Sequence, residues 1–547
     1  MPRFGEGQWA LGYREPLNKA EAIKKDDDGL NVRARIINTY SKQGFSSIWP
    51  DDLRSRMRWW GLYTQRRQGI PGGMTARAEP WELEDEFFML RVRIAGGRMN
   101  SEQLRTIAHI SERYGRSVAD VTDRQNVQLH WIRIEDVPEI WNLLEAVDLS
   151  TCEACGDTPR NMLGCPVAGV DEAELFDATP DLLAVSRRFV GDPAFSNFPR
   201  KFKTAVSACH QHCAQHEIHD LAFVGVEYGD SLGYDVWVGG GLGPNPHFGK
   251  RLGVFVERDQ ILDVWAAAAG VFRDYGFRRA RNRARVKFLM AEWGPAKYRE
   301  IMEKEYLGYA LPDGPAPSPS TTAQRDHVGT FRQKDGRNYI GFAPRAGRIS
   351  AQQLRYAADL ADEYGSGELR ATPQQKVVIL DVDPSRTGEL VDKLERQDLR
   401  VNPSAFRRGT MACTGIEFCK LAIVETKSRA DWLYRELEER MPDFDEPIRI
   451  NLNGCPNSCA RFQVADIGFM GSLMTKPDGT KIDGYQVHLG GHLGSDHRFG
   501  RKVKGLKVPA HTLADYVEKL LRTYLATRTE GEKFHEWSSR APEVWLR

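Results

Sequence analysis

"GGRMNSEQLRTIAHISERYG" (residues 96–115) and "AGRISAQQLRYAADLADEYG" (residues 346–365) read as two copies of one segment. Identical residues recur at a constant separation of 250 positions, as in Leu104 with Leu354 and Tyr114 with Tyr364. Self-similarity at one fixed separation is typical of a repeated structural unit. The sequence therefore predicts an internally duplicated chain in which each half is an α+β unit.

The first copy predicts a strand, a helix and a returning strand. "FFMLRVRIA" (87–95) alternates with the period of a strand. Asn100 or Ser101 is placed to cap a helix that carries apolar residues on one side. "RQNVQLHWI" (124–132) then reads as the returning strand.

The two faces of that returning strand differ in chemistry. Because side chains alternate, Val127, Leu129 and Trp131 are expected on one face. The opposite face carries hydrogen-bonding side chains, namely Arg124, Asn126, Gln128 and His130. A solvated sheet face and a binding site for a ligand with several carboxylates both explain this pattern.

Composition limits the classes of protein that fit. The chain has 547 residues, which is enough for two to four domains, and 41% of them are hydrophobic. It carries 76 Lys+Arg against 75 Asp+Glu, without the basic excess of a nucleic-acid-binding protein. The sequence shows no apolar run long enough for a membrane span and no secretory signal pattern. We expect a cytoplasmic protein whose nine cysteines are reduced.

Four cysteines in the second half form two close pairs. Cys413 and Cys419 lie in "MACTGIEFC", and Cys455 and Cys459 lie in "NGCPNSC". Four thiolates from two turns suit a [4Fe–4S] cluster or a tetrahedral zinc ion. The mixed spacing fits zinc knuckles poorly, and four unrelated buried cysteines are the remaining alternative.

The first half holds a related but different group of cysteines. Cys209 and Cys213 occupy the repeat positions of Cys455 and Cys459, within the histidine-rich stretch "CHQHCAQHEIH" (209–219). Cys155 lies roughly where Cys413 lies in the second half. A zinc site and a remnant of the duplication are both open, and the remnant is the favoured interpretation.

"TGIEFCK" together with "NGCPNSCARFQVADIGF" resembles the sirohaem and [4Fe–4S] signature of the sulfite/nitrite reductase family. The resemblance runs from about residue 60 to the C-terminus and includes the duplication, "LRVR", "PRKFKTAV" and "GGGLG". It implies a duplicated α+β fold with ferredoxin-like half-domains and two larger α/β cofactor-binding domains. It also implies one sirohaem and one [4Fe–4S] cluster, with Cys459 bridging the two.

The resemblance assigns roles to further residues. The substrate cage matches Arg91, Arg160, Lys201 and Lys203. The sirohaem-binding strand matches Thr122, Arg124, Gln128 and His130. The glycines expected to lie close to the macrocycle are Gly239, Gly240 and Gly241. Some members of the family join a tyrosine ring to a cysteine sulfur beside the site, and Tyr63 and Cys155 match those positions.

The implied activity is the six-electron reduction of sulfite to sulfide with electrons from ferredoxin. Lys203 favours sulfite, because a dianion gains more from an additional cation than a monoanion does. Ferredoxin-dependent reduction of nitrite to ammonia is the alternative, and a non-catalytic iron–sulfur electron carrier is an alternative of another class. We expect a monomer that binds a small anion, with no nucleic-acid or membrane partner.

The expected division of the chain follows from the repeat and the linker-like stretch "ALPDGPAPSPSTTAQRD". It comprises an N-terminal arm (1–60), a first ferredoxin-like half-domain (61–150), a first sirohaem and substrate domain (151–309), a linker (310–326), a second half-domain (327–400) and a second domain with the cluster and sirohaem ligation (401–547).

Overall fold

A computed structural model describes residues 17–318 and 325–547 of the chain. Two five-stranded sheets contain the repeated segments and share one hydrophobic core. In sheet order, the first comprises β1 (Leu62–Arg66), β2 (Glu84–Val92), β5 (Val127–Ile132), β4 (Val118–Val121) and β12 (Arg348–Ser350). The second comprises β10 (Gly329–Arg332), β11 (Asn338–Phe342), β14 (Val377–Val382), β13 (Glu368–Ala371) and β3 (Arg98–Asn100). The two sheets have the same order, so the predicted duplication is confirmed.

The two half-domains exchange a strand. β12 belongs to the second copy in sequence but pairs with β4 of the first, and β3 of the first copy pairs with β13 of the second. The glycine turns at Gly97 and Gly347, both with positive φ, send each short strand across to the partner sheet. Neither sheet is complete without the other copy, which holds the halves in a fixed relation.

Helices α6 (Ser101–Tyr114) and α11 (Ala351–Tyr364) start directly after the exchanged strands. Asn100 is the N-cap of α6 and forms a capping box with Gln103, and Ser350 with Gln353 does the same for α11. The helices contact each other through ion pairs such as Arg355 with Glu112 at 2.7 Å. The predicted strand–helix–strand order is therefore confirmed, with α7 (Val137–Glu145) and α12 (Thr387–Arg396) following the returning strands.

One prediction about the returning strand is wrong. Trp131 has φ +63° and lies at a bulge in the β2–β5 pairing, so Ile132, rather than Trp131, joins Leu129 in the core. The Trp131 ring instead lies 3.9 Å from the Arg116 guanidinium. The second copy keeps the bulge, because Asp381 has φ +62° at the equivalent position.

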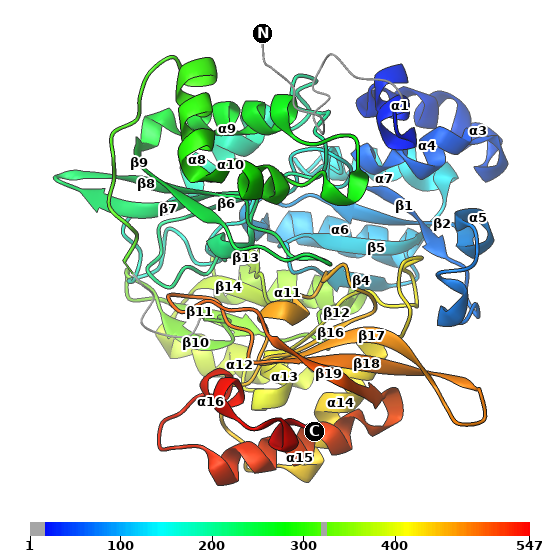
Figure 1. The fold of residues 1–547 in the computed structure, drawn as a ribbon, viewed down its shortest axis with the longest axis vertical. Coiled ribbons are helices and arrows are strands. Elements are labelled where there is room, and N and C mark those ends of the chain that lie inside the picture. Colours follow the sequence, from blue (N-terminus) through cyan, green and yellow to red (C-terminus); the bar gives the residue numbers. More distant parts are fainter. Residues whose placement is uncertain (1–16, 319–324) are drawn as a thin grey trace.

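Two further units of helices and a sheet lie at opposite ends of the molecule (Figure 1). The first contains β6 (Thr204–Ser207), β7 (Leu221–Tyr228), β8 (Ser231–Val238) and β9 (Lys250–Glu257), with α8 (Thr179–Phe189), α9 (Ile261–Tyr275) and α10 (Val286–Ile301). The second contains β15 (Thr410–Ala412), β16 (Ile450–Asn453), β17 (Ile467–Thr475), β18 (Lys481–Leu489) and β19 (Arg501–Pro509), with α14 (Lys427–Arg440), α15 (Leu513–Thr527) and α16 (Phe534–Arg540). Both have a parallel start and antiparallel later strands, so the α+β fold class is confirmed.

The described part of the N-terminal arm is a set of short helices whose apolar residues pack in the core of the half-domains, with hydrogen bonds to the first of these units. These are α1 (Lys19–Asp26), α2 (Val32–Arg35), α3 (Ser41–Gln43) and α4 (Pro50–Arg54), with short 3-10 and π turns between them. Lys24 of α1 is buried and donates to the Phe198 carbonyl at 2.7 Å. Trp59 donates to the Ser196 carbonyl at 2.8 Å. The arm therefore supports the segment that leads into Lys201 and Lys203.

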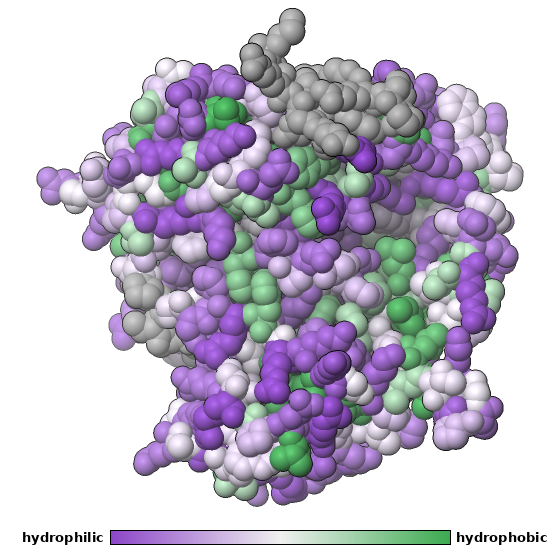
Figure 2. All heavy atoms as spheres, in the orientation of Figure 1, coloured by the Kyte–Doolittle hydropathy of each residue, from purple (hydrophilic) through white to green (hydrophobic). Residues whose placement is uncertain are grey.

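The expected linker falls partly outside the described residues, at 319–324. Its start packs along β9, where the amide of Phe255 donates to the Pro312 carbonyl at 2.9 Å. The exact domain boundaries stay a prediction. No helix in the described part of the chain combines the length and apolar character that crossing a membrane requires. On the face in Figure 2, hydrophilic residues predominate and apolar residues form small separate groups.

Candidate active site

The four cysteines of the second half gather at one edge of its sheet. Cys413 directly follows β15 and Cys455 follows β16, and these parallel strands end at the same edge. The amide of Gly454 donates to the Cys413 sulfur at 3.2 Å, which places the two cysteine pairs side by side. The four thiols are not among the described groups whose ligand atoms all lie within 4.8 Å of one another. This wider spacing suits a cluster better than a single ion.

The surroundings of three of these thiols disfavour the bare thiolate. Burial, together with the neighbouring Cys459, raises the pKa of Cys413 to about 12 and also raises the pKa of Cys419 and Cys455. Such thiols become good ligands only where a metal cation replaces the proton. Cys459 is the exposed member of the set. The donor set therefore fits a [4Fe–4S] cluster.

Residues of the first half hold the loop that carries Cys419. The Arg66 guanidinium donates to the Pro71 carbonyl at 3.0 Å and lies 3.5 Å from the Ala422 carbonyl. A Cβ on Gly72 would lie 1.6 Å from the Ile423 carbonyl oxygen, so only glycine fits there. The cluster loop and the strand-β1 region are thus one packed unit.

A cavity with an excess of positive charge lies beside the exposed thiol. Its charged lining residues are Arg124, Lys201, Lys203, Arg285, Arg461 and Asp123, and the others are Leu163, Gln215, Ile218, His219, Leu242, Asn457 and Ser458. Asp220 pairs with Arg285 at 2.7 Å, and Asp123 lies 3.8 Å from Arg461. Five cations therefore face two carboxylates. Asn457 and Ser458 precede Cys459, so the cavity and the thiols adjoin.

Unsatisfied polar atoms in the cavity wall point to an anionic ligand. The Nε atoms of Arg124 and Arg461 and the Ser458 hydroxyl are buried without a hydrogen-bond partner. Leaving such donors unpaired costs free energy, so a ligand with several acceptor oxygens is expected at this place. A macrocycle that carries many carboxylates fits both the charge and the donors. The residues present therefore fit sirohaem.

The lowered pKa values of Lys201 and Lys203 reflect the excess of positive charge in the cavity. Burial and the cations Arg285, Arg200 and Arg160 lower the pKa of Lys201 to about 7. Burial, together with Arg124 and Lys201, lowers the pKa of Lys203 well below its usual range. Desolvation and like charges both disfavour the protonated amine, so an anionic ligand would reverse this shift.

Arg91 lies where the predicted substrate residues and the predicted crosslink meet. Its guanidinium donates to Gln128 Oε1 at 2.6 Å and lies 2.7 Å from the Cys155 sulfur. The same guanidinium is 6.0 Å from the centre of the Tyr63 ring. Arg160 is anchored nearby, with Nε donating to the Ala154 carbonyl at 3.1 Å. The structure therefore brings Arg91, Gln128, Cys155 and Tyr63 together.

Some residues predicted to bind sirohaem lie outside this cavity. Thr122 Oγ1 accepts from the amide of Asn126 at 3.0 Å and shapes the turn before β5. His130 is fully buried, pairs with Asp120 at 2.9 Å and stacks on Phe418 at 3.9 Å. Of the donor-face residues weighed in the sequence, Arg124 alone is among those lining the cavity.

The glycine loop has a packing role within the protein. A Cβ on Gly239 would meet the Met290 side chain at 2.7 Å, and one on Gly240 would meet the Glu217 carbonyl at 2.5 Å. A Cβ on Gly241 would meet Arg285, a cation of the cavity, at 2.7 Å. The loop itself reaches the cavity through Leu242. Close approach of these glycines to the macrocycle stays a prediction.

Sequence reasoning missed several lining residues. Arg461 follows Cys459 by two positions and has φ +56°, so its nearness to the motif was a usable signal. Arg285 and His219 come from separate segments, and His219 Nε2 lies 2.9 Å from Arg124. No pattern local to Arg285 or His219 indicates that they share a cavity.

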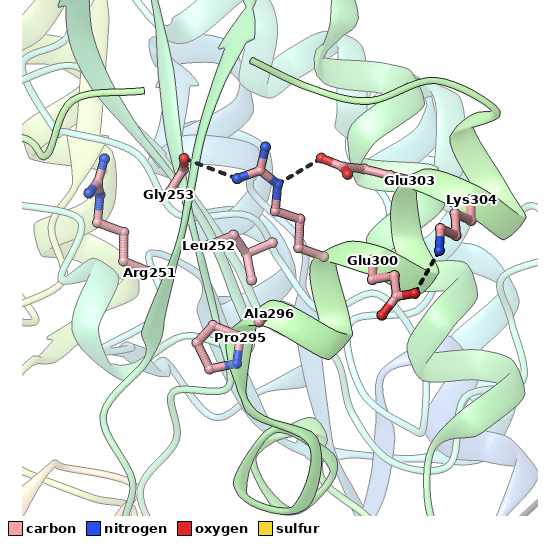
Figure 3. Close-up of a pocket in the computed structure, with 9 residues that line it drawn as sticks. Arg251, Leu252, Gly253, Pro295, Ala296, Glu300, Glu303 and Lys304 are labelled. Carbon is pink, nitrogen blue, oxygen red and sulfur yellow. Dashed lines mark hydrogen bonds and ion pairs between the residues drawn. The ribbon is translucent and has the colours of Figure 1, made fainter. Parts of the chain in front are cut away.

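A second hollow of about 410 Å³ lies between β9 and the end of α10 (Figure 3). Its wall includes the ion pairs of Arg299 with Glu303 and of Lys304 with Glu300, both at 2.7 Å. Its lining residues include no thiol or imidazole. It has no feature of a redox site.

Four cysteines spaced for an iron–sulfur cluster lie beside a cavity lined with cations. This combination defines a redox metalloprotein that binds an anionic cofactor or substrate. Comparison with known proteins then identifies the family. The chain matches the nitrite and sulphite reductase 4Fe-4S domain over residues 155–310 and 404–547, and the nitrite/sulfite reductase ferredoxin-like half domain over 82–147 and 331–397. The chain belongs to the nitrite and sulfite reductase family, as predicted. A sirohaem and a [4Fe–4S] cluster are its cofactors.

Individual relatives cover the whole chain. It is 52% identical over 547 residues to "Sulfite reductase [ferredoxin] 1" of Mycolicibacterium paratuberculosis, covering 99% of this chain and 98% of the relative. The solved structure of the Mycobacterium tuberculosis NirA protein matches with a TM-score of 0.97 and 50% identity, covering 99% of this chain and 100% of that one. The assimilatory ferredoxin-dependent nitrite reductase of Haloferax mediterranei is 35% identical, covering 95% and 91%.

Replacing Lys201 with methionine tests the charge balance of the cavity. In the cofactor-free protein the folded state loses the Lys201 proton near pH 7, whereas an unfolded chain keeps it to about pH 10.4. Because the unfolded state then binds more protons, this lysine makes stability rise with pH above 7, by up to about 1.4 kcal/mol per pH unit. We expect Lys201→Met to be more stable than wild type at pH 6.5, with the difference shrinking towards pH 9.

Thermal midpoints of both cofactor-free proteins across that pH range are the measurement. Lys504→Met, on the exposed part of β19, is the matched control and should leave the profile unchanged. A difference between wild type and Lys201→Met that stays constant with pH would contradict the lowered pKa of Lys201.

Replacing Cys459 with serine tests the proposed bridging thiolate. Cys459 is the exposed member of the thiol set and adjoins the cationic cavity, so one sulfur is placed to serve both cofactors. We expect Cys459→Ser to lose activity and to disturb both the cluster and the sirohaem signals in electron paramagnetic resonance. Cys152→Ser, outside the cluster loop, is the control. Normal coupling between the two centres in Cys459→Ser would overturn the bridging assignment.

Proposed function

We propose that the chain reduces sulfite to sulfide with six electrons supplied by reduced ferredoxin. The observation that carries this proposal is the cation-rich cavity directly beside the exposed thiol of a four-cysteine set. The names of the relatives at 50–52% identity support sulfite as substrate and ferredoxin as electron donor. A purified protein that oxidises reduced ferredoxin in the presence of sulfite and releases sulfide is the direct test.

The alternative of a non-catalytic electron carrier leaves the cavity unexplained. A carrier needs a cluster and a docking face, but it does not need five basic residues around one cavity. Burying more cations than carboxylates is costly, so the excess positive charge indicates an anionic ligand. The cavity therefore favours an enzyme.

We assign the substrate cage to Arg91, Arg160, Lys201 and Lys203. When bound, sirohaem supplies an iron at which a small anion can be held and reduced. The guanidinium of Arg91 is held by Gln128, and that of Arg160 by the Ala154 carbonyl, so both present fixed donors that suit anion oxygens. Preorganised cations of this kind offset the charge of the anion and polarise its oxygens.

We assign proton delivery to the two lysines. Each oxygen lost from sulfite leaves as water and consumes protons. Both lysines are buried beside other cations, and burial and these cations lower the pKa of each ammonium group and make it a better proton donor. Lys203 lies beside Lys201 in the same cavity wall and adds a positive charge for a dianion.

Substituting asparagine for Lys203 tests the choice between sulfite and nitrite. Removing one cation costs a dianion more than a monoanion, because the Coulomb energy scales with the product of the charges. We expect kcat/KM for sulfite to fall on the order of tenfold more than kcat/KM for nitrite. Lys203→Arg, which keeps the charge, is the control. Equal losses for both substrates would show that this position does not set selectivity.

We propose that ferredoxin docks on the surface around the cluster loop. Leu421, two residues after Cys419, is 62% exposed. Thr75 donates to the Ala422 carbonyl at 2.7 Å, which places the segment of Arg67 to Arg77 against this loop. Arg67 and Arg77 are exposed and carry the charge that an acidic carrier would require.

The double variant Arg67→Glu with Arg77→Glu should raise the KM for reduced ferredoxin several-fold at low ionic strength. The rate with reduced methyl viologen should not change, because a small dye does not need the docking face. Lys504→Glu, on the basic stretch of β19, is the matched control and should behave as wild type. A similar loss with both donors, or a similar effect of Lys504→Glu, would contradict this docking surface.

A covalent bond between Tyr63 and Cys155 stays a prediction. Cys155 is fully buried and contacts Arg91, whose guanidinium also lies over the Tyr63 ring. Burial and the neighbouring Cys155 raise the pKa of Tyr63. The thiol and the phenol ring lie near the same guanidinium, and this nearness supports the proposed thioether.

We also propose a monomer in the cytoplasm. All nine cysteines are free in the structure, which suits a reducing compartment. Sedimentation of the purified protein would establish its oligomeric state.

A further inference from the structure

A second group of metal-ligating side chains occupies the repeat position of the cluster. Met411 of β15 pairs with Asn451, and its counterpart Leu163 forms a parallel bridge with Ala205. Leu163 and Met411 are 248 positions apart in the sequence. The first residues of α8 and α14, Thr179 and Lys427, are separated by the same number of positions. The two loops are therefore equal in length, and Cys165 corresponds to Cys413. The expected correspondence of Cys155 with Cys413 is wrong.

The remaining cluster positions follow from the same comparison. A separation of 246 relates β6 with β16 and β7 with β17, so Cys209 and Cys213 correspond to Cys455 and Cys459. The constant loop length places Asp171 at the position of Cys419. The first half thus keeps three of the four cysteines, with aspartate at the fourth position.

The surroundings of this second group have become apolar. Gln128 and His130 of β5, near the cluster loop, correspond to Val378 and Leu380 of β14. These two residues pack directly in one buried cluster with Cys165, Cys209 and Cys213. The cysteines are at most 4% exposed. A polar redox site and an apolar, closed site therefore occupy equivalent places in the duplicated fold.

The second group contains two overlapping triads of ligand atoms that share Cys165, and each triad is close enough for one ion. Those of Cys165, Cys213 and His327 all lie within 4.8 Å of one another, as do those of Cys165, Asp171 and Cys209. His327 Nε2 is 3.3 Å from the Cys213 sulfur. Sulfur atoms around a tetrahedral zinc ion are about 3.8 Å apart, as zinc–sulfur bonds of about 2.3 Å require.

We propose that Cys165, Cys209, Cys213 and His327 bind one zinc ion as a closed structural site. Three thiolates and one imidazole are an established tetrahedral zinc donor set. The ligand atoms of Cys165, Cys213 and His327 are compactly spaced, and Cys209 belongs to a second compact triad that shares Cys165, whereas no three of the four cluster cysteines form such a triad. Zinc ions are not redox-active, so a zinc site is compatible with a reducing compartment.

Neighbouring side chains are arranged to support these ligands. His327 Nδ1 lies 3.4 Å from the Tyr339 hydroxyl, which leaves Nε2 directed at the thiols. The Arg325 guanidinium binds the Asp171 carboxylate and lies 3.4 Å from the Cys209 sulfur. Asp171 in turn lies 3.5 Å from the Cys209 sulfur. Outer contacts of this kind orient metal ligands, and Arg325 offsets the charge of three thiolates.

The site would fasten the second half of the chain to the first. His327 lies two residues before β10 and after the expected linker, whereas the three cysteines belong to the first cofactor-binding unit. It is fully buried with φ +60°, a conformation that non-glycine residues rarely adopt. A metal bond is a strong reason to hold a histidine there.

Metal analysis of the cofactor-loaded protein tests the proposal. After equilibration with Zn²⁺ and removal of free metal, we expect about one zinc ion per chain in wild type. His327→Ala and Cys213→Ser should lose this zinc while keeping their iron, and their melting temperatures should fall. Cys152→Ser, whose thiol lies outside both cysteine groups, should keep zinc and stability.

A second measurement on wild type does not depend on how the variants fold. Native protein is alkylated with and without a zinc chelator, and the modified cysteines are mapped by mass spectrometry after digestion. The chelator should make Cys165, Cys209 and Cys213 reactive together. Zinc-edge X-ray absorption should show three sulfur neighbours and one nitrogen. Wild type without zinc, a disulfide among these cysteines, or zinc retained in both ligand variants would overturn the proposal.

Discussion

The buried carboxylate of Asp120 ties together the three parts of the molecule that build the active site. It pairs with His130 of the same half-domain at 2.9 Å and with Arg348 of the exchanged strand β12 at 3.0 Å. Lys427, the first residue of α14, lies 3.5 Å away. Burial alone would raise the pKa of Asp120, but Lys427, Arg348 and His130 outweigh it and hold the pKa well below the usual range. Removing the carboxylate would leave these groups buried without a partner, a far larger cost than the pair itself contributes.

Much of the fold could be predicted from the sequence because the duplication repeats the same sequence pattern in both halves. The helix cap at Asn100 and the cysteine pairs are local signals, and the structure keeps them where the pattern places them. Arg91 and Gln128 could also be grouped, since they lie opposite each other on paired strands. These features depend on neighbours in sequence or on strand alternation, which a reader of the sequence can follow.

What could not be predicted depends on contacts between distant segments. The bulge at Trp131 shifts alternation by one residue and sends Ile132 to the core. Arg285, at the start of α10, lines the cavity and pairs there with Asp220 from a separate segment of the chain. The correspondence of Cys165 with Cys413 requires the strand register, because Cys155 and Cys165 are equally plausible on the chain. In each case the deciding information is a three-dimensional register, which composition and spacing do not contain.

The two copies have kept one geometry and diverged in electrostatics. Around the cluster, polar side chains and an exposed thiol adjoin a cavity whose cations exceed its anions, so the folded protein is incomplete without an anionic cofactor. Around the second group, Val378 and Leu380 seal three cysteines and a histidine away from solvent. A site that exchanges electrons and substrate must keep open polar surface, whereas a site that only holds chain segments gains stability from closure. After the duplication, one copy therefore kept the reactive cluster site, and the equivalent place in the other copy became a closed site that supports the structure.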